Sequence, residues 1–180
     1  MFHVKGGGQL ADTGFVGSHR VIDVHHTADG DVDHIVDSLD SEVHVGDTVV
    51  LAVDEARRTQ NTLLHSAGHV IAGVLAAPFR QVTPLGAHHY PGECRVEFRA
   101  GAEVIDSIRV ALPTLLADAI AQDMPVMVVG DPEVNRAIKI GDFPAIPCGG
   151  THLQSIAALR HVEIITIKMK DGRLRISYRL

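Results

Sequence analysis

The chain has 180 residues, 46% of them hydrophobic and 21% charged, and a formal net charge of −6. These values predict one, or at most two, globular domains with a substantial core, and they argue against a protein that grips nucleic acid along its whole surface. No apolar run approaches the roughly 18 residues of a membrane span, and the N-terminus has no apolar h-region. Because there are also only two cysteines, we expect a cytoplasmic protein without a disulfide framework.

Short apolar runs separated by turns occupy the N-terminal part of the chain. Residues 16–24 and 33–36 predict strands around a turn at Asp29-Gly30, and residues 48–53 predict another strand. Before them stands Gly6-Gly7-Gly8, where positive φ angles allow a sharp turn or a close approach to a ligand. No Gly-Lys-Ser/Thr follows this cluster, so it does not predict a P-loop.

Residues 54–76 predict the longest helix, with Asp54 as its N-cap. One apolar stripe recurs at helical spacing: Leu63, Leu64, Ala67, Val70, Ile71, Val74 and Leu75. His65 and His69 fall on the side away from that stripe, among small residues that leave room for another segment or a substrate. Gly68 and Gly73 cost roughly 1 kcal/mol each relative to alanine, so close packing or a site must offset them.

The second half of the chain predicts more strands than helices. We expect strands at residues 94–98, 125–129 and 137–140, and a helix at residues 113–121 that has Pro113 in its first turn. A β-hairpin is expected around Asp171-Gly172, between residues 162–169 and 173–178. Many strands with two substantial helices predict a two-layer α+β fold.

Histidines and basic residues are unevenly distributed. Of the 12 histidines, most, such as the pairs His25-His26 and His88-His89, lie in turn-like contexts where we expect exposure. Candidates for a local basic patch are Arg57-Arg58 and a C-terminal set. That set comprises Lys168, Lys170, Arg173, Arg175 and Arg179. The alternative for the C-terminal set is a strand with one solvated face. The chain has no tryptophan, so base stacking on a single strand is not the expected binding mode.

Two short motifs carry candidate metal ligands. His65-Ser66-Ala67-Gly68-His69 places two imidazoles one helical turn apart, although such a pair also arises by chance and both histidines could simply be exposed. Pro147-Cys148-Gly149-Gly150-Thr151-His152 is more specific, because its glycines let Cys148 and His152 reach the same ion. A buried cysteine in a glycine turn and a catalytic Cys–His pair are the alternatives. Together the motifs offer three histidines and one cysteine, a full tetrahedral zinc set.

With these motifs, the chain resembles the editing domain of alanyl-tRNA synthetase and its free-standing relatives, the AlaX proteins. The resemblance extends over nearly the whole chain. It passes through Gly6-Gly7-Gly8-Gln9, Asp12, Gly14, Gly46-Asp47, Val53-Asp54, Arg57-Arg58, both histidine motifs and Arg175-Ile176-Ser177-Tyr178. It implies a single editing-type domain over residues 1–180, with a mostly antiparallel sheet packed by the long histidine-bearing helix.

The resemblance also implies the site. His65, His69, Cys148 and His152 would bind Zn²⁺, Gln9 would be the catalytic residue, and Gly7, Gly8 and Thr151 would bind substrate. The activity implied is hydrolysis of the ester of mischarged tRNA(Ala), chiefly seryl-tRNA(Ala), in trans, with the tRNA acceptor end as partner and no membrane. Whether the ion activates water or positions the substrate stays open, as do a seryl or glycyl preference and the oligomeric state.

Two alternative functions remain open, and one segment of the sequence differs from the family pattern. A non-catalytic zinc module that binds RNA or a partner is one alternative. Threonyl-type tRNA editing is the other, although Gly149-Gly150-Thr151 follows the alanyl pattern. The departure is at the start, where Phe2-His3-Val4-Lys5 replaces the family's Phe-Tyr-Pro-Glu. The sequence begins there, so either its start was assigned too late or the chain is a shortened member without the upstream threonine that contributes to serine recognition in the family.

Overall fold

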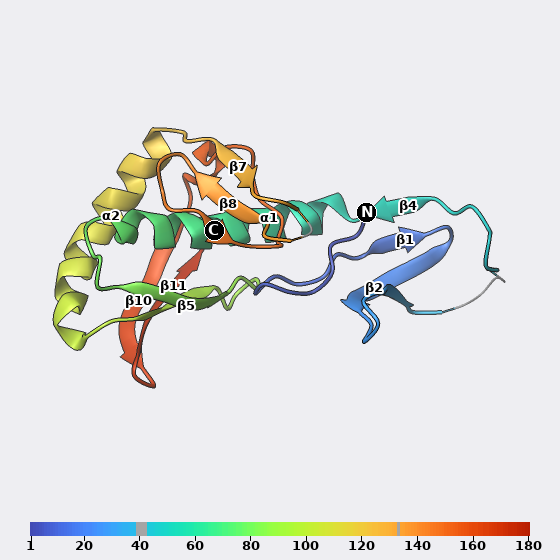
Figure 1. The fold of residues 1–180 in the computed structure, drawn as a ribbon, viewed down its shortest axis with the longest axis horizontal. Coiled ribbons are helices and arrows are strands. Elements are labelled where there is room, and N and C mark those ends of the chain that lie inside the picture. Colours follow the sequence, from blue (N-terminus) through green and yellow to red (C-terminus); the bar gives the residue numbers. More distant parts are fainter. Residues whose placement is uncertain (39–42, 133) are drawn as a thin grey trace.

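Antiparallel strands and two long helices make up most of the structure, a computed structural model that describes residues 1–38, 43–132 and 134–180. The molecule is elongated, with the first four strands at one end and the second helix at the other (Figure 1). Every strand pairing described is antiparallel, so the predicted α+β class with antiparallel sheets is confirmed.

The N-terminal sheet has the strand order β3-β2-β1-β4 and a small core of its own. Its strands are β1 (Gly14–Val16), β2 (His19–His26), β3 (Val32–Val36) and β4 (Leu51–Val53). The core consists of Phe2, Ala11, Val21 and Val24. The strand predicted at residues 16–24 is confirmed from His19 onward as β2, but its start is wrong, because Gly17 takes a φ of +59° and turns the chain between β1 and β2. β4 is also shorter than predicted, since it begins only at Leu51.

Helix α1 (Glu55–Ala76) follows with the predicted N-cap, because the Asp54 side chain accepts a hydrogen bond from the Arg57 N–H at 3.0 Å. Its C-terminal two-thirds is buried on nearly all sides, His65 and His69 included. The two histidines therefore do not face solvent opposite an apolar stripe. Other segments of the chain cover that side of the helix, for which the small residues beside the histidines leave room, as the sequence predicts.

The largest sheet has the order β10-β11-β6-β5 and packs on α1. Its strands are β5 (Thr83–His88), β6 (Arg95–Arg99), β10 (Glu163–Lys170) and β11 (Arg173–Arg179). The predicted hairpin is confirmed, with positive φ at both turn residues, Asp171 at +52° and Gly172 at +72°. Strand β5 was not predicted from the sequence, because its Thr-Pro-Leu-Gly-Ala-His run lacks alternation and contains Pro84 and Gly86, two residue types that are depleted in strands.

Helix α2 (Ile105–Ala121) begins eight residues earlier than the sequence predicts, after the short 3₁₀ turn η1 (Ala102–Val104). Pro113 therefore lies inside the helix and not in its first turn, which corrects the prediction. The buried residues Ile108, Leu112 and Leu116 recur every four positions across the proline. Their burial stabilises the helix on both sides of Pro113, which would otherwise end it.

A three-stranded sheet, β7-β8-β9, leads into the cysteine motif. It contains β7 (Val126–Val129), β8 (Ala137–Ile140) and β9 (Ile146–Pro147), and the 3₁₀ turn η2 (Ala157–Leu159) follows the motif. β8 confirms the prediction at residues 137–140, and β7 begins one residue later than predicted. None of the helices in the described part of the chain is long and apolar enough to cross a bilayer.

Candidate metal centre

The two histidine motifs meet in space. One ligand atom from each of His65, His69, Cys148 and His152 lies within 4.8 Å of the other three, and Cys148 Sγ is 3.2 Å from His65 Nε2. The imidazole rings of His65 and His69 are 4.6 Å from that of His152, centroid to centroid. The structure thus assembles the predicted set of three nitrogens and one sulfur, the composition of many zinc sites.

Gln9 determines how the His65 ring presents its nitrogens. The backbone N–H of Thr151 donates to Gln9 Oε1 at 3.1 Å, so the atom facing it must be the amide oxygen. The same oxygen lies 2.6 Å from His65 Nδ1, which must therefore carry the hydrogen. His65 Nε2 is left with a free lone pair directed at Cys148. This is the arrangement in which a carbonyl oxygen orients a metal-binding histidine.

A carbonyl oxygen also orients the ring of His152. Its Nδ1 lies 3.1 Å from the carbonyl oxygen of Gly150, which can only accept, so Nδ1 donates. Its Nε2 is buried and has no hydrogen-bond partner among the described residues. A buried acceptor without a partner costs free energy unless something binds it, and a cation among the four ligands would satisfy it. The residues therefore fit a zinc ion.

Burial shifts the pKa values of the candidate ligands, and in each case it favours the uncharged form of the side chain. Burial lowers the pKa of His69 to about 4 and that of His152 to about 3, the latter with help from neighbouring His69. It also raises the pKa of the Cys148 thiol, an effect that the Gly150 N–H and Arg136 partly oppose. The histidines are then neutral near pH 7, as metal ligands must be, and a bound cation would stabilise the Cys148 thiolate.

Steric contacts explain why glycine is needed in both motifs and at Gly73. A Cβ on Gly150 would lie 2.1 Å from His65 Cε1, so only glycine lets the loop approach α1. A Cβ on Gly68 would meet the His89 ring at 2.2 Å, and one on Gly73 would meet the Phe143 ring at 2.3 Å. Close packing thus offsets the cost of two glycines within α1, as expected. Ser66 also contributes, because its hydroxyl accepts from the Leu153 N–H at 3.0 Å.

The N-terminal glycine run brings Gln9 to the centre. Gly7 and Gly8 have φ angles of +57° and +77°, and Gly6 and Gln9 exchange backbone hydrogen bonds across this turn. The buried Asp12 anchors the segment by pairing with Arg58 in the first turns of α1. Arg58 is therefore engaged in holding the loop, and the neighbouring Arg57 donates to the Ala11 carbonyl. Arg57-Arg58 does not form the free basic patch considered from the sequence.

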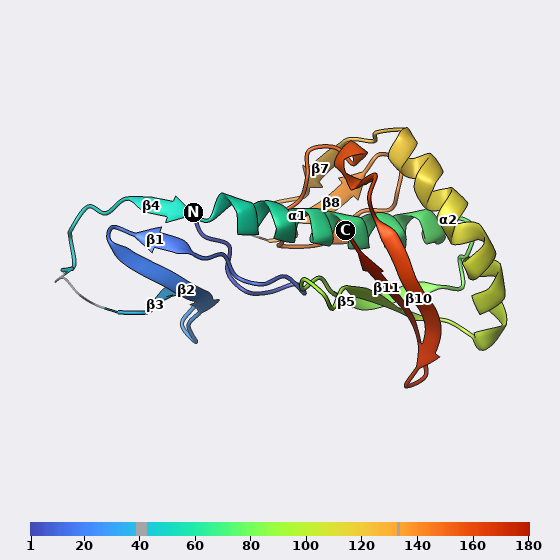
Figure 2. The same ribbon diagram turned by 180° about the vertical axis from the view of Figure 1, so that it is seen from behind.

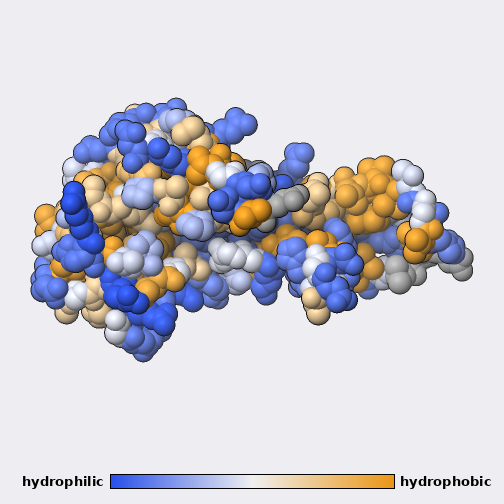
Figure 3. Space-filling view, viewed as in Figure 1, coloured by the Kyte–Doolittle hydropathy of each residue, from blue (hydrophilic) through white to orange (hydrophobic). Residues whose placement is uncertain are grey.

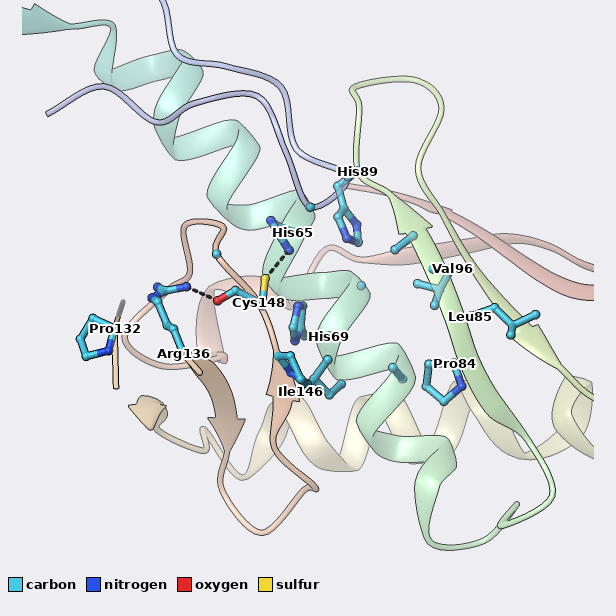
Figure 4. Close-up of a pocket in the computed structure, with 18 residues that line it drawn as sticks. His65, His69, Pro84, Leu85, His89, Val96, Pro132, Arg136, Ile146 and Cys148 are labelled. Atoms are coloured by element: carbon cyan, nitrogen blue, oxygen red, sulfur yellow. Dashed lines mark hydrogen bonds between the residues drawn. The ribbon is translucent and has the colours of Figure 1, made fainter. Parts of the chain in front are cut away.

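Beside the ligands lies a cavity of about 690 Å³. His65, His69 and Cys148 lie on one side of it, and Pro84 and Leu85 of β5 lie on the other (Figure 4). Gly7 and Gly8 also line the cavity. Gln9 and Thr151 do not line this cavity. Gln9 is fully buried, and its amide nitrogen donates to Thr151 Oγ1 at 2.9 Å.

His89 was missed, and its predicted exposure is wrong. Only 2% of it is exposed, and its ring stacks on His65 with centroids 4.4 Å apart. Tyr178 donates to the Leu64 carbonyl at 2.9 Å and accepts from His89 Nδ1 at 2.5 Å, which fixes the ring beside the cavity. Burial, followed by its histidine neighbours, lowers the pKa of His89 to about 3. No local signal distinguishes it from His25 and His26, which are exposed as predicted.

Relatives of this chain among known proteins include an alanyl-tRNA editing protein and alanine–tRNA ligases. No family model matches the chain. It is 29% identical to the alanyl-tRNA editing protein AlaX-M of Pyrococcus horikoshii, over 91% of the chain and 75% of that protein. The chain is AlaX-like. Alanine–tRNA ligases of Frankia alni and Methanococcus aeolicus are 28% and 24% identical over 92% and 99% of the AlaX-like chain. This chain spans only about a fifth of those ligases, 21% and 22% of their lengths.

Proposed function

We propose that the protein hydrolyses, in trans, the ester that joins an amino acid to mischarged tRNA(Ala), chiefly seryl-tRNA(Ala). The relatives whose names state alanyl-tRNA editing and alanine–tRNA ligation support the substrate class. The observation that carries the proposal is the set of four ligand atoms within 4.8 Å of one another beside a cavity of about 690 Å³. A purely structural metal site needs no such cavity.

The metal we propose is Zn²⁺, held by His65, His69, Cys148 and His152. When bound, zinc supplies Lewis acidity that can polarise an ester carbonyl or lower the pKa of water, or it can act by orienting the substrate. Other side chains of the protein hold these ligands in position. Arg136 donates to the carbonyls of Cys148 and Gly150 and so fixes the cysteine loop.

We assign the substrate-holding role to the glycine turn. Gly7 and Gly8 line the cavity, and their backbone N–H groups are the donors we propose for the ester oxygen as charge develops on it. Gln9 and Thr151 act together behind His65. Their hydrogen bonds to each other and to His65 make Gln9 essential to the reaction by setting the orientation of a ligand.

A preference for the seryl ester is part of the proposal. A site that hydrogen-bonds a serine hydroxyl rejects alanine, because its polar groups would then be left unpaired. We also propose that residues 1–180 act as one editing-type domain, with α1 and the β10-β11-β6-β5 sheet as its two layers. The supporting contact is that between Gln9 of the N-terminal segment and His65 of α1.

A second candidate is a non-catalytic zinc module. It is favoured by the four protein ligands, which leave no open position at a tetrahedral ion. The two candidates differ in what chelation does to the protein. A structural zinc contributes directly to folding, so its removal unfolds the domain, whereas removal of a catalytic zinc leaves a folded, inactive protein.

The decisive experiment is deacylation of seryl-tRNA(Ala) by the zinc-loaded protein, run beside correctly charged alanyl-tRNA(Ala) and seryl-charged threonine tRNA. We expect the seryl ester of tRNA(Ala) to be lost and the alanyl ester to be spared. Absence of turnover by a folded, metal-loaded protein would favour the non-catalytic module. Faster hydrolysis on threonine tRNA would favour threonyl-type editing.

A further inference from the structure

The β10-β11-β6-β5 sheet is strongly basic although the chain as a whole is acidic. Strands β6, β10 and β11 contain seven of the chain's 16 lysine and arginine residues and two acidic residues, Glu97 and Glu163. The seven are Arg95, Arg99, Lys168, Lys170, Arg173, Arg175 and Arg179. These strands therefore carry a charge of +5, whereas the whole chain carries −6.

Strand alternation and register place these cations on one face. On β11 the buried residues Leu174, Ile176 and Tyr178 point toward α1, so the arginines between them point away. Across the strand pairs, Lys168 is opposite Arg175 and Lys170 is opposite Arg173. Side chains directly opposite each other lie on the same face of a sheet. We call this surface the basic sheet face. In Figure 3, strongly hydrophilic residues surround the projecting hairpin that carries part of it.

One carboxylate organises three of the arginines. Glu97 lies 2.6 Å from Arg175, 3.1 Å from Arg173 and 3.5 Å from Arg95, so the cluster keeps an excess of two positive charges. Beside it is a groove of about 500 Å³ whose charged lining is four cations and one acidic residue. Those charged residues are Glu93, Arg95, Lys168, Arg175 and Arg179.

We propose that the basic sheet face binds the phosphate backbone of the base-paired acceptor stem of the tRNA; this assignment rests on the proposed function. Alternate residues of a strand are about 7 Å apart, so the cations form rows that suit a repeating phosphate backbone better than a single small anion. The aromatic residues of these strands, Phe98 and Tyr178, are buried against the core. The face therefore lacks the stacking platform typical of sites that bind unpaired bases.

The position of the face relative to the metal centre supports this assignment. β5 is the edge strand of the sheet, and the same strand forms a wall of the ligand cavity. Arg95 on β6 is opposite His88 at the end of β5, and the next residue, His89, lines the cavity. Figure 2 shows β5 running below α1, with the β10-β11 hairpin crossing it in this view. An unpaired 3′ end need only pass around β5 for its ester to enter the cavity while the stem stays on the basic sheet face.

The test compares two double variants of the full-length, metal-loaded protein. Lys168→Ala with Arg179→Ala removes two cations that line the groove. Arg20→Ala with Arg80→Ala, the matched control, removes two exposed arginines elsewhere on the surface. Binding of an uncharged acceptor-stem RNA minihelix is measured at several salt concentrations. We expect the groove variant to bind about tenfold more weakly, with a slope of log affinity against log salt that is smaller by about 2.

A second measurement separates the stem from the ester. The groove variant should hydrolyse a seryl minihelix with a raised KM and a short seryl-adenosine ester at the parent rate. Equal slowing on the short ester would mean that the face acts through the structure of the site, and this would overturn the proposal. Equal minihelix affinity and salt slope in both double variants would overturn it as well. Failure of the parent to hydrolyse any seryl ester would instead contradict the proposed function, because the binding measurement needs no turnover.

Discussion

The N-terminal sheet and the helix-and-sheet body differ in how much they bury and in what they contribute to the site. The body, from α1 onward, has a continuous core that includes Ile71, Phe98 and Ile176, each fully buried. The N-terminal sheet rests on a core of four buried residues and exposes apolar side chains such as Phe15 and Leu51. The body supplies all four candidate metal ligands, while the N-terminal segment supplies Gln9, which is hydrogen-bonded to one of them. Stability and ligand orientation thus come from different regions.

The largest effect expected is that of Cys148→Ala, which removes a ligand supplied by the body. We expect bound zinc to be lost and seryl-tRNA(Ala) hydrolysis to fall by more than the roughly 10–100-fold typical of an outer-sphere partner. Metal analysis and single-turnover deacylation measure the two losses. The matched control is Cys94→Ala, which removes the other free cysteine, buried near Tyr178 and outside the ligand set. If Cys94→Ala lost zinc equally, the ligand assignment would be contradicted.

A core substitution in each region tests whether the two cores are independent. Ile71→Ala should lower the free energy of unfolding of the body by about 2–5 kcal/mol, because it leaves a cavity in a close-packed core. Val24→Ala removes less apolar surface and should reduce amide protection mainly in β1 to β3. Hydrogen exchange with denaturant titration resolves the two effects. A uniform loss of protection with Val24→Ala would show that both regions unfold together.

Gln9→Ala examines the contribution of the N-terminal segment to the body's metal site. It removes the acceptor for both His65 Nδ1–H and the Thr151 N–H, so zinc affinity or activity should fall by roughly 10–100-fold. Competition with a chelator measures the zinc affinity. Gln60→Ala, an exposed glutamine on α1, is the control and should bind zinc as the parent does. Unchanged affinity in Gln9→Ala would assign the orientation of His65 to α1 alone.

A further effect expected is an acid sensitivity confined to the body. In the metal-free protein, burial holds the pKa values of His69 at about 4 and of His89 and His152 at about 3. The unfolded chain takes up protons below about pH 6.5, whereas these folded groups remain neutral. The free energy of unfolding should therefore be greatest above pH 6.5 and should fall as the pH drops toward 4. Each histidine contributes up to about 1.4 kcal/mol per pH unit.

Denaturant titrations of the metal-free protein between pH 7.5 and 4 measure this fall. Amide protection in β1 to β3 provides the internal control, since His25 and His26 on β2 are exposed. An equal loss of protection in the N-terminal sheet would contradict the localisation. A free energy of unfolding that stayed constant down to pH 4 would show that the pKa values of the three histidines are the same in the folded and unfolded states.

Local chemistry explains which elements the sequence predicts well. Asp54 caps α1 because its carboxylate can accept the Arg57 N–H, and Asp171-Gly172 forms the hairpin turn because both residues tolerate positive φ. The ligand motifs were also recognisable, since their spacing alone brings two histidines to one helix face and lets a glycine loop fold back. In contrast, the start of α2 eight residues before Pro113 depended on the burial of Ile108 and Leu112 in a core built from segments remote in sequence.

By itself the sequence determined the α+β class, the bounds of α1 and the identity of the four candidate ligands, because periodicity, caps and motif spacing are properties of neighbouring residues. Only the tertiary structure decided the burial of His65 and His89, the hydrogen bond of Gln9 that leaves His65 Nε2 unprotonated, and the gathering of cations on one sheet face. Each of these depends on segments more than 50 residues apart or on the register of paired strands. Such properties arise only when a particular packing excludes water and brings distant groups together.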